Sequence, residues 1–275
     1  MIVDNVGRFY ILNGSIYPAH TMENINIPTD NAVYEVIRII DGVPLFIWDH
    51  YERMRNSFYL LKKELQFTEK DLNLEIRRLA DENKQDNFNV KVMAYIDGEN
   101  QGMLLYVSKS YYPVKEEIEK GVAVSLLYIE RENPNAKVIN QDYKTKVSRK
   151  IEEDDVFEVL LVNRANFITE GSRSNVFFVK NSKAYTAPGD FVLKGITRQY
   201  VMEACRRAGV ELVEELIDVD SLVEVEALFL SGTSIKVLPI SQVEQIKFAS
   251  SVHPAVVAIR NEYDMLIHEY ITQNK

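Results

Sequence analysis

The chain has 275 residues, of which 46% are hydrophobic and 27% are charged. This composition is ordinary for a globular protein, and the length suffices for about two domains that fold without a disulfide or a structural metal. The single cysteine, Cys205, excludes an internal disulfide and a zinc cage, and the four histidines are scattered. We therefore expect neither a structural metal nor a metal-centred mechanism.

The charge balance is acidic, with 32 Lys and Arg residues against 41 Asp and Glu residues. Nonspecific binding to nucleic acid or to an anionic membrane requires a basic surface, so neither partner is expected. No apolar run approaches the roughly 20 residues that cross a bilayer, and the first residues lack the apolar core of a signal peptide. These features predict a cytoplasmic protein.

The first part of the chain is predicted to form strands and then helices. Asn-Gly at 13–14 and Asp-Gly at 41–42 indicate hairpin turns between runs of β-branched and aromatic residues. Asp49 is the expected N-cap of the next helix, with Glu52 as its capping-box partner. The other elements expected here are strands at 33–40, 43–47, 90–96 and 103–108 and helices at 50–63 and 69–83, the second of them started by Thr68.

Residues 116–121 are interpreted as a linker, because the surrounding segment is polar, contains Pro113 and ends in Gly121. The linker separates an N-terminal α+β domain, residues 1–115, from a C-terminal domain, residues 122–275.

In the C-terminal domain, the helix at 197–208 is expected to have Thr197 as its N-cap and Gly209 just after its end. A turn is predicted at 163–166. The other elements expected in this domain are strands at 122–129, 156–162, 176–179 and 227–230 and helices at 143–153 and 254–271.

Three segments of the C-terminal half carry features that suit an anionic ligand, although the common nucleotide, hydrolase and metalloprotease motifs are missing. A glycine precedes a helix start in LKGITRQY, and free N–H groups in the first turn of a helix suit a phosphate. A strand runs into a turn of small residues in LFLSGTSIK, and Glu170 ends a strand in FITEGSRSNVFFVK. Each feature also fits an ordinary cap, an ordinary turn or a solvated carboxylate.

Taken in this order, the three segments resemble the fold-type IV (class IV) pyridoxal-phosphate enzymes. This family includes D-amino-acid and branched-chain aminotransferases and aminodeoxychorismate lyases, and the resemblance extends to VYEVIRIIDGVPLFIWDHYERM in the N-terminal half. It implies an α/β (α+β) fold with a smaller N-terminal domain and a larger C-terminal domain with a barrel-like sheet. It also implies pyridoxal 5′-phosphate (PLP) between the domains and a homodimer.

The resemblance assigns the cofactor site residue by residue. Lys137, in NAKVINQ, matches the catalytic Schiff-base lysine, whereas Lys144 and Lys146 lie too close to the strand-end glutamate. Glu170 matches the acid that bonds the pyridine nitrogen and keeps it protonated. Without the resemblance, the arginine of the phosphate site would be interpreted as an exposed helix charge. The phosphate contacts implied are Arg53, Ile196, Thr197, Gly232 and Thr233.

The substrate side departs from the D-amino-acid aminotransferases, because residues 95–97 read YID where those enzymes have TRG with a carboxylate-binding arginine. Residues 29–31 read TDN in place of the usual GDG. Lys91 could replace part of the missing charge or be a surface lysine. Tyr34 could line the substrate or pack in the core, and Arg173 could face the substrate or pair with a carboxylate. The substrate residues proposed by resemblance are Tyr34, Lys91, Arg173 and Ser234.

The resemblance implies an aminotransferase that exchanges an amino group between an amino acid and a 2-oxo acid by a ping-pong mechanism. The alternative is an aminodeoxychorismate lyase that releases pyruvate and 4-aminobenzoate without an oxo-acid acceptor. A third interpretation is a binding module that keeps the fold without catalysis, but the joint presence of Lys137, Glu170 and Arg53 argues against it.

Overall fold

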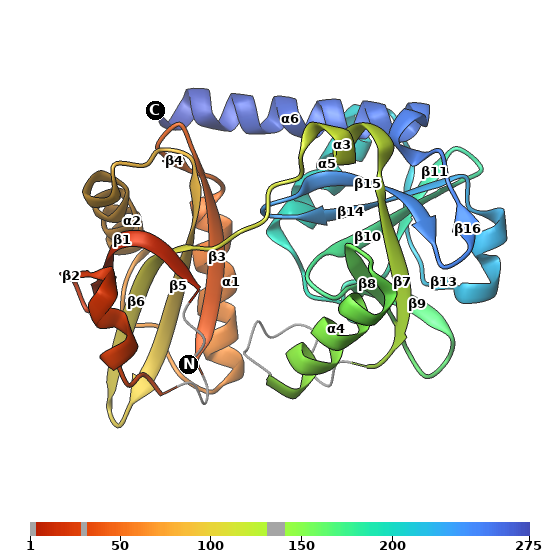
Figure 1. Ribbon diagram of the computed structural model, residues 1–275. Helices are drawn as coiled ribbons and strands as arrows, with labels where there is room; N and C mark the ends of the chain where they lie inside the picture. Colours follow the sequence, from red (N-terminus) through yellow and green to blue (C-terminus); the bar gives the residue numbers. More distant parts are fainter. Residues whose placement is uncertain (1–3, 29–31, 131–140) are drawn as a thin grey trace. The chain divides into compact units, whose positions relative to one another are not determined.

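The computed structural model describes residues 4–28, 32–130 and 141–275 (Figure 1). The described chain divides into two compact units. The first contains the residues up to Tyr111 together with His268–Lys275, and the second contains the described residues between them.

Within the described residues, the first unit is built on a six-stranded antiparallel sheet with the order β2-β1-β6-β5-β3-β4. Both predicted hairpin turns are confirmed. Asn13 and Gly14 have φ of 49° and 78°, and Asp41 and Gly42 have φ of 51° and 77°. Positive φ at both central residues matches the right-handed twist of the flanking strands. The strands are β1 (Asn5–Leu12), β2 (Ser15–Pro18), β3 (Val33–Ile40), β4 (Val43–Pro44), β5 (Phe88–Asp97) and β6 (Asn100–Ser108).

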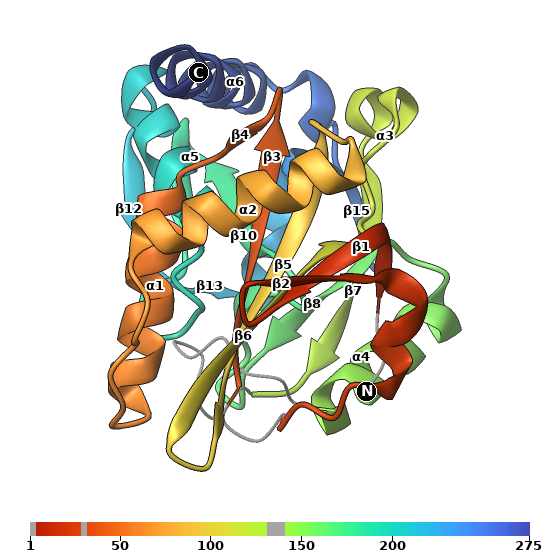
Figure 2. The ribbon, with the colours of Figure 1, turned by 90° about the vertical axis from the view of Figure 1, so that its left-hand side faces the viewer.

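Helices α1 (Ile47–Leu60) and α2 (Glu69–Asn83) lie over one face of this sheet (Figure 2). The predicted start of α2 is confirmed, because the Thr68 hydroxyl accepts from the Asp71 N–H at 3.3 Å and the Asp71 carboxylate accepts from the Thr68 N–H at 2.8 Å. The core between the sheet and the helices is apolar and includes Val33, Ile37, Val90, Met54, Phe58, Leu72 and Ile76.

The predicted start of α1 is wrong. The helix begins at Ile47, so Asp49 lies in its first turn and is not the N-cap, and the expected strand at 43–47 is only Val43–Pro44. The chain turns at Phe46, which has φ of 53° and packs its ring edge-on against Tyr270 at 4.8 Å. The Tyr270 hydroxyl accepts a hydrogen bond from the Ile47 N–H at 3.3 Å. Contacts distant in sequence therefore set this helix start.

The opposite face of the sheet has an apolar end and a polar end. The 3₁₀ helix η1 (Ala19–Asn24) places Met22 on the apolar end, against Tyr10, Met93 and Leu104. At the polar end, Lys91 of β5 and Tyr106 of β6 are cross-strand neighbours. The alternation of β3 and β5 thus sends apolar residues to the helices and the Tyr34 and Lys91 side chains to the other face.

The second unit is built on a mixed sheet that curls into a half-barrel and has ten strands among the described residues (Figure 1). Its order is β12-β11-β10-β14-β15-β7-β8-β9-β13, with β16 paired to β15. The 3₁₀ helices η2 (Val219–Glu224) and η3 (Ser250–Val252) complete the loops. The strands are β7 (Val122–Tyr128), β8 (Glu158–Val162), β9 (Phe167–Gly171), β10 (Asn175–Lys180), β11 (Lys183–Thr186), β12 (Leu212–Glu214), β13 (Ile217–Asp218), β14 (Ala227–Gly232), β15 (Lys236–Val243) and β16 (Ile246–Lys247).

The interpretation of residues 116–121 as a linker is corrected by α3 (Lys115–Lys120), which belongs to the second unit. The Glu117 carboxylate accepts from the Val114 N–H at 2.8 Å, and Ile118 packs against the core of this unit. The C-terminal boundary also differs from the expected one. Helix α6 (Pro254–Asn274) contributes its last turns, from His268, to the first unit.

The remaining helices of the second unit are α4 (Gln141–Asp154), which packs on β7 and β8, and α5 (Ile196–Arg207), which packs on β14. Helix α5 has Gly195 as its N-cap in place of the predicted Thr197, whereas Gly209 has φ of 69° just past the helix end, as predicted. None of the helices in the described ranges combines the length and the apolar character needed to cross a membrane.

Candidate active site

Lys137, the predicted catalytic lysine, lies outside the described residues. The site is therefore built from the side chains that each unit positions by itself. In the second unit these are Glu170, the start of α5 and the turn between β14 and β15. In the first unit they are Arg53 and the polar end of the sheet.

Glu170 is buried at the end of β9, where the strand turns into the segment 171–174. Its Oε2 atom accepts the Leu193 N–H at 3.0 Å and the Asn175 side-chain amide at 3.4 Å. Glu170 is thus a buried acceptor and not a solvated turn residue. A carboxylate is the group that pairs with a cationic ring nitrogen.

Asn175 connects the three segments of this unit. Its Nδ2 atom donates to Glu170 Oε2 and, at 2.9 Å, to the Leu193 carbonyl. In the sheet, Asn175 of β10 lies opposite Ser231 of β14. Its Oδ1 atom lies against Gly195, at the start of α5. The sequence pattern alone gives Asn175 no role, although a polar residue at the head of an apolar strand is a signal for a buried hydrogen-bonding position.

The start of α5 is held rigidly. Ile196 and Thr197 are buried, and the Thr197 side chain is hydrogen-bonded to the Tyr263 hydroxyl of α6. The buried Arg198 guanidinium donates to the Ala187 carbonyl at 3.0 Å and to Glu214 at 2.7 Å. The first N–H groups of a helix lack partners within the helix, so a rigid helix start is a suitable phosphate site.

The second predicted phosphate turn joins β14 to β15, with Gly232 paired to Lys236 and Thr233 and Ser234 between them. All three predicted residues of this turn are half-buried. A Cβ atom on Gly232 would lie 3.7 Å from the Ser174 Cβ, so this turn adjoins the segment after Glu170. The second unit therefore brings together the three segments that the sequence singled out.

The segment 171–174 is organised by Glu158, a buried residue of β8. Its Oε1 atom accepts the Arg173 N–H at 2.6 Å, the Ser174 hydroxyl at 3.1 Å and the Ser172 hydroxyl at 3.3 Å. Burial raises the pKa of Glu158, and the Arg173 charge and these hydrogen bonds offset the rise only in part. Sequence reasoning offers no signal for Glu158 beyond a charged residue next to a run of apolar residues.

Arg173 itself is exposed. Its guanidinium donates to the Phe157 carbonyl at 2.8 Å and lies 5.9 Å from the centre of the Phe157 ring. These contacts hold the side chain against the strand end, and its charge acts on the Glu158 carboxylate.

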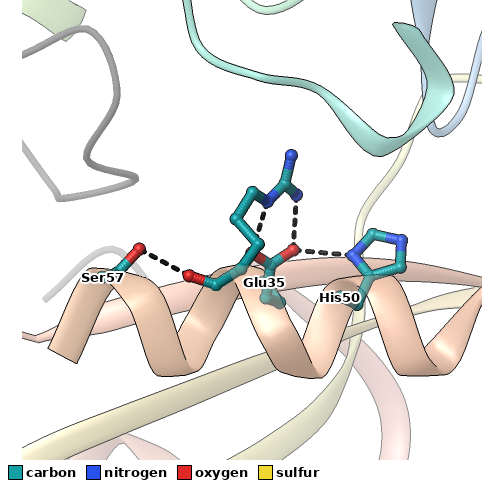
Figure 3. Close-up of polar contacts among 4 residues, drawn as sticks. Glu35, His50 and Ser57 are labelled. Carbon is teal, nitrogen blue, oxygen red and sulfur yellow. Dashed lines mark hydrogen bonds and ion pairs between the residues drawn. The ribbon is translucent and has the colours of Figure 1, made fainter. Parts of the chain in front are cut away.

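In the first unit, Arg53 is held by a buried carboxylate (Figure 3). Its Nε atom donates to Glu35 Oε1 at 2.8 Å and its Nη2 atom to Glu35 Oε2 at 2.6 Å. His50 Nδ1 lies 2.7 Å from the same Oε2. The Arg53 side chain is 11% exposed and that of Glu35 is 0% exposed, so Arg53 is not the exposed helix charge that its sequence position alone suggests.

The ionisation of Glu35 follows from these contacts. Burial by itself raises the pKa of a carboxyl group, but the Arg53 charge and the hydrogen bonds from Arg53 and His50 outweigh it and hold the pKa of Glu35 at about 2. Glu35 is therefore an anion at neutral pH. Neither Glu35 nor His50 is among the residues that the resemblance assigns, although a charged residue on the apolar side of a strand is itself a signal.

Lys91 is not a surface lysine, because its side chain is 12% exposed. Its ammonium lies 3.2 Å from Asp4 Oδ1 and 5.6 Å from the ring centres of both Tyr34 and Tyr106. The Tyr106 hydroxyl donates to Asp4 at 2.6 Å. Burial raises the pKa of Asp4, but this hydrogen bond and Lys91 outweigh it and lower the pKa below its ordinary value.

Comparisons with known proteins identify the family. The family model for class IV amino-transferases matches residues 32–243. The D-alanine aminotransferase of Bacillus licheniformis is 26% identical over 225 residues, covering 78% of this chain and 79% of that protein. A Thermotoga maritima protein named "Probable branched-chain-amino-acid aminotransferase" is 30% identical over 224 residues, covering 79% of both. The solved branched-chain aminotransferase of Thermoproteus uzoniensis with norvaline has a TM-score of 0.84 at 20% identity, over 98% of this chain and 97% of that one.

The chain therefore belongs to the class IV aminotransferases, and it is a PLP-dependent transaminase. The structural likeness confirms the expected fold. PLP is the cofactor of this family, as expected. The two relatives are named as aminotransferases, which does not favour the lyase alternative.

The described residues suit this cofactor chemically. PLP combines a phosphate dianion with a ring nitrogen that is cationic when protonated. The second unit offers a buried carboxylate, Glu170, and a rigid helix start at Ile196 and Thr197, and the first unit offers the Arg53 guanidinium. A guanidinium and helix N–H groups are the donors that bind phosphate without a metal.

Proposed function

We propose that this chain transfers an amino group between an amino acid and a 2-oxo acid, with Lys137 as the lysine that forms the Schiff base with PLP. Glu170 carries the proposal. It is a buried carboxyl group at a strand end, and its Oε2 atom accepts hydrogen bonds from the Leu193 N–H and from the Asn175 side-chain amide.

The residues of the chain have distinct roles in this proposal. Glu170 holds a proton on the pyridine nitrogen. Arg53, the start of α5 at Ile196 and Thr197, and the turn at Gly232 and Thr233 bind the phosphate. The proposed phosphate site thus combines a side-chain cation with backbone N–H donors, and together these groups can bind a phosphate without a metal ion.

The Lys137 amine would accept the α-proton of the substrate as a general base and donate it again as a general acid within the same half-reaction, and the second half would run these two proton transfers in reverse. Bound PLP supplies a sink for the electrons that the departing proton leaves on the substrate. Lys137 must be deprotonated for this step, and in general a lysine amine loses its proton more readily when it is buried or lies near another cation.

On the substrate side, Tyr34, Lys91, Arg173 and Ser234 are proposed to line the amino acid. Two observations support Lys91: its side chain is mostly buried, and its ammonium lies 5.6 Å from the ring centres of both Tyr34 and Tyr106. One relative is named for D-alanine and the other for branched-chain amino acids, so D-alanine and the branched-chain amino acids are the first substrates to assay. A homodimer and a cytoplasmic location remain predictions from the sequence and the resemblance.

The test is reduction of the PLP-loaded protein with borohydride, followed by peptide mass spectrometry. We expect a single phosphopyridoxyl adduct on the peptide that contains Lys137, and none in Lys137→Ala, whereas the control Lys144→Ala keeps the adduct. An adduct on Lys144 or Lys146 would show that the lysine is wrongly assigned. No adduct at all would contradict a lysine-bound cofactor.

A single-turnover assay separates the transaminase from the lyase. Without a 2-oxo acid acceptor, a transaminase releases at most one equivalent of oxo acid per active site and then stops. Continued release of pyruvate from aminodeoxychorismate under the same conditions would overturn the proposal in favour of the lyase.

A further inference from the structure

We propose that Glu35 is a positioning residue of the phosphate site: its carboxylate holds the Arg53 guanidinium in the orientation that binds a phosphate monoester dianion. The proposal rests on the proposed function, in which Arg53 contacts the cofactor phosphate. It adds a residue on the neighbouring strand that acts only through Arg53.

Glu35 stands where the pattern of β3 predicts an apolar residue. It shares the helix-facing side of the strand with Val33 and Ile37, which belong to the apolar core under α1 and α2. Burying a carboxylate is unfavourable unless it is paired and hydrogen-bonded. Replacing a buried ion pair by apolar residues of similar volume often leaves stability unchanged or raises it. Stability alone therefore does not explain a carboxylate at this position.

The contacts of Glu35 define a direction for Arg53. Two N–H bonds, from Nε at 2.8 Å and from Nη2 at 2.6 Å, join one edge of the guanidinium to both carboxylate oxygens. A contact of this kind fixes the plane of the guanidinium and not only its position. His50, one turn earlier on α1, lies 2.7 Å from Oε2 and holds the carboxylate in turn (Figure 3).

Two effects of Glu35 on phosphate binding oppose each other. Its negative charge repels a phosphate, whereas its grip on Arg53 removes rotamer freedom that binding would otherwise have to remove. We infer that orientation dominates because the Arg53 side chain is mostly buried. Without the Glu35 carboxylate the guanidinium loses the two hydrogen bonds that fix its plane.

The experiment measures dissociation constants of PLP and of pyridoxal, which lacks the phosphate, for the full chain stripped of cofactor. In Glu35→Gln we expect the PLP constant to rise at least about tenfold, the range expected from disturbing a hydrogen bond to a charged group. The pyridoxal constant should change less than about twofold. Inorganic phosphate should also compete less well with PLP in this variant than in the wild type.

Ser57→Ala is the matched control. The Ser57 hydroxyl donates to the Arg53 carbonyl at 2.9 Å, so this variant disturbs the same helix turn without touching the guanidinium (Figure 3). The ratio of the PLP and pyridoxal constants should remain that of the wild type. Glu35→Asp, which keeps the charge but draws back the oxygens, should show a smaller loss than Glu35→Gln, and it provides the test if the Gln variant does not fold.

The outcomes separate this inference from the proposed function. If Arg53→Ala leaves the ratio of PLP to pyridoxal affinity unchanged, the assignment of Arg53 to the phosphate fails. If Arg53→Ala weakens PLP selectively but Glu35→Gln and Glu35→Asp do not, the positioning role of Glu35 is overturned while the function stands. Tighter PLP binding in Glu35→Gln would show that charge repulsion outweighs orientation and would equally overturn the proposal.

Discussion

The backbone of Gly195 lies so close to Oδ1 of Asn175 that a Cβ atom at this glycine would overlap the amide oxygen. Gly195 has φ of −64°, an ordinary value for any residue, so its side chain is excluded by space and not by backbone conformation. Asn175 in turn donates to Glu170 and to the Leu193 carbonyl. The positions of the start of α5 and of Glu170 thus depend on one close approach between Gly195 and Asn175.

Gly195→Ala is expected to displace Asn175 and with it the hydrogen bonds at Glu170. Overpacking of a close contact typically costs about 1–3 kcal/mol of stability. We expect a lower unfolding midpoint in urea and weaker PLP binding. Gly189→Ala is the control, because the atoms close to its added Cβ belong to the flexible Lys194 side chain. Equal effects of the two variants would contradict a specific role for the contact between Gly195 and Asn175.

Gly171→Ala tests the turn that follows Glu170. The added Cβ would lie 2.7 Å from Glu158 Oε1 and would overlap the Ser174 hydroxyl. Both atoms belong to the hydrogen-bonded cluster that holds residues 171–174, so the turn must open. We expect a loss of stability of about 1–3 kcal/mol and a clear fall in kcat. Wild-type kcat together with wild-type stability would show that this cluster does not position the turn.

The local elements of the fold follow from the sequence where local rules decide them. Asn13-Gly14 and Asp41-Gly42 form turns because these residues tolerate positive φ. Thr68 starts α2 because it and Asp71 cap each other. The start of α1 could not be predicted, because it depends on Phe46 packing against a tyrosine at the far end of the chain.

The site divides in the same way. Glu170 and the segments LKGITRQY and LFLSGTSIK were singled out by the order of their motifs, and their roles toward the cofactor stay predictions. Glu158 and Asn175 were not, because their roles arise only when strands distant in sequence pair and bury them. Lys91 illustrates the limit, since its position on β5 does not reveal Asp4 as its ion-pair partner.

The pKa of Glu35 predicts a loss of stability in acid. A carboxyl group with a pKa of about 2 in the folded protein and an ordinary value of about 4.3 in the unfolded chain stabilises the fold above pH 4.3. This contribution is lost as the pH falls from about 4.3 toward 2. The urea unfolding midpoint of Glu35→Gln should therefore lie below that of the wild type at pH 7, and the difference should shrink by pH 3. A difference that does not depend on pH would contradict the lowered pKa.

Glu158 is expected to change the pH dependence of stability in the opposite direction. Burial raises its pKa in the folded protein, so the ionised carboxylate opposes folding at a pH above that raised value. This destabilisation decreases as the pH falls toward the ordinary pKa of a glutamate, because the carboxyl group then becomes protonated in the folded protein. A glutamine keeps an oxygen that accepts from Arg173 and Ser174, so Glu158→Gln should be at least as stable as the wild type at pH 8. Its advantage should decrease at pH 5. Greater stability of the wild type at pH 8 would show that the charged form is favoured.

The ion pair between Lys91 and Asp4 makes a prediction about substrate affinity. If Lys91 binds the substrate carboxylate, Asp4 competes for the same ammonium from 3.2 Å. Asp4→Asn keeps an oxygen for the Tyr106 hydroxyl and removes the competing charge. We expect its KM for the 2-oxo acid to fall by up to about fivefold, the range set by a partly exposed ion pair, with kcat nearly unchanged.

Lys91→Met should raise KM, and Lys91→Arg, which keeps the charge, should restore most of the affinity. Steady-state kinetics with pyruvate and with a branched 2-oxo acid measure both the expected fall in KM for Asp4→Asn and the expected rise for Lys91→Met. A KM that none of the three variants alters would show that the ammonium near Tyr34 and Tyr106 supports only the sheet. A common fall in kcat and kcat/KM would instead place Lys91 in the chemical step, because an interaction made only in the transition state lowers both equally.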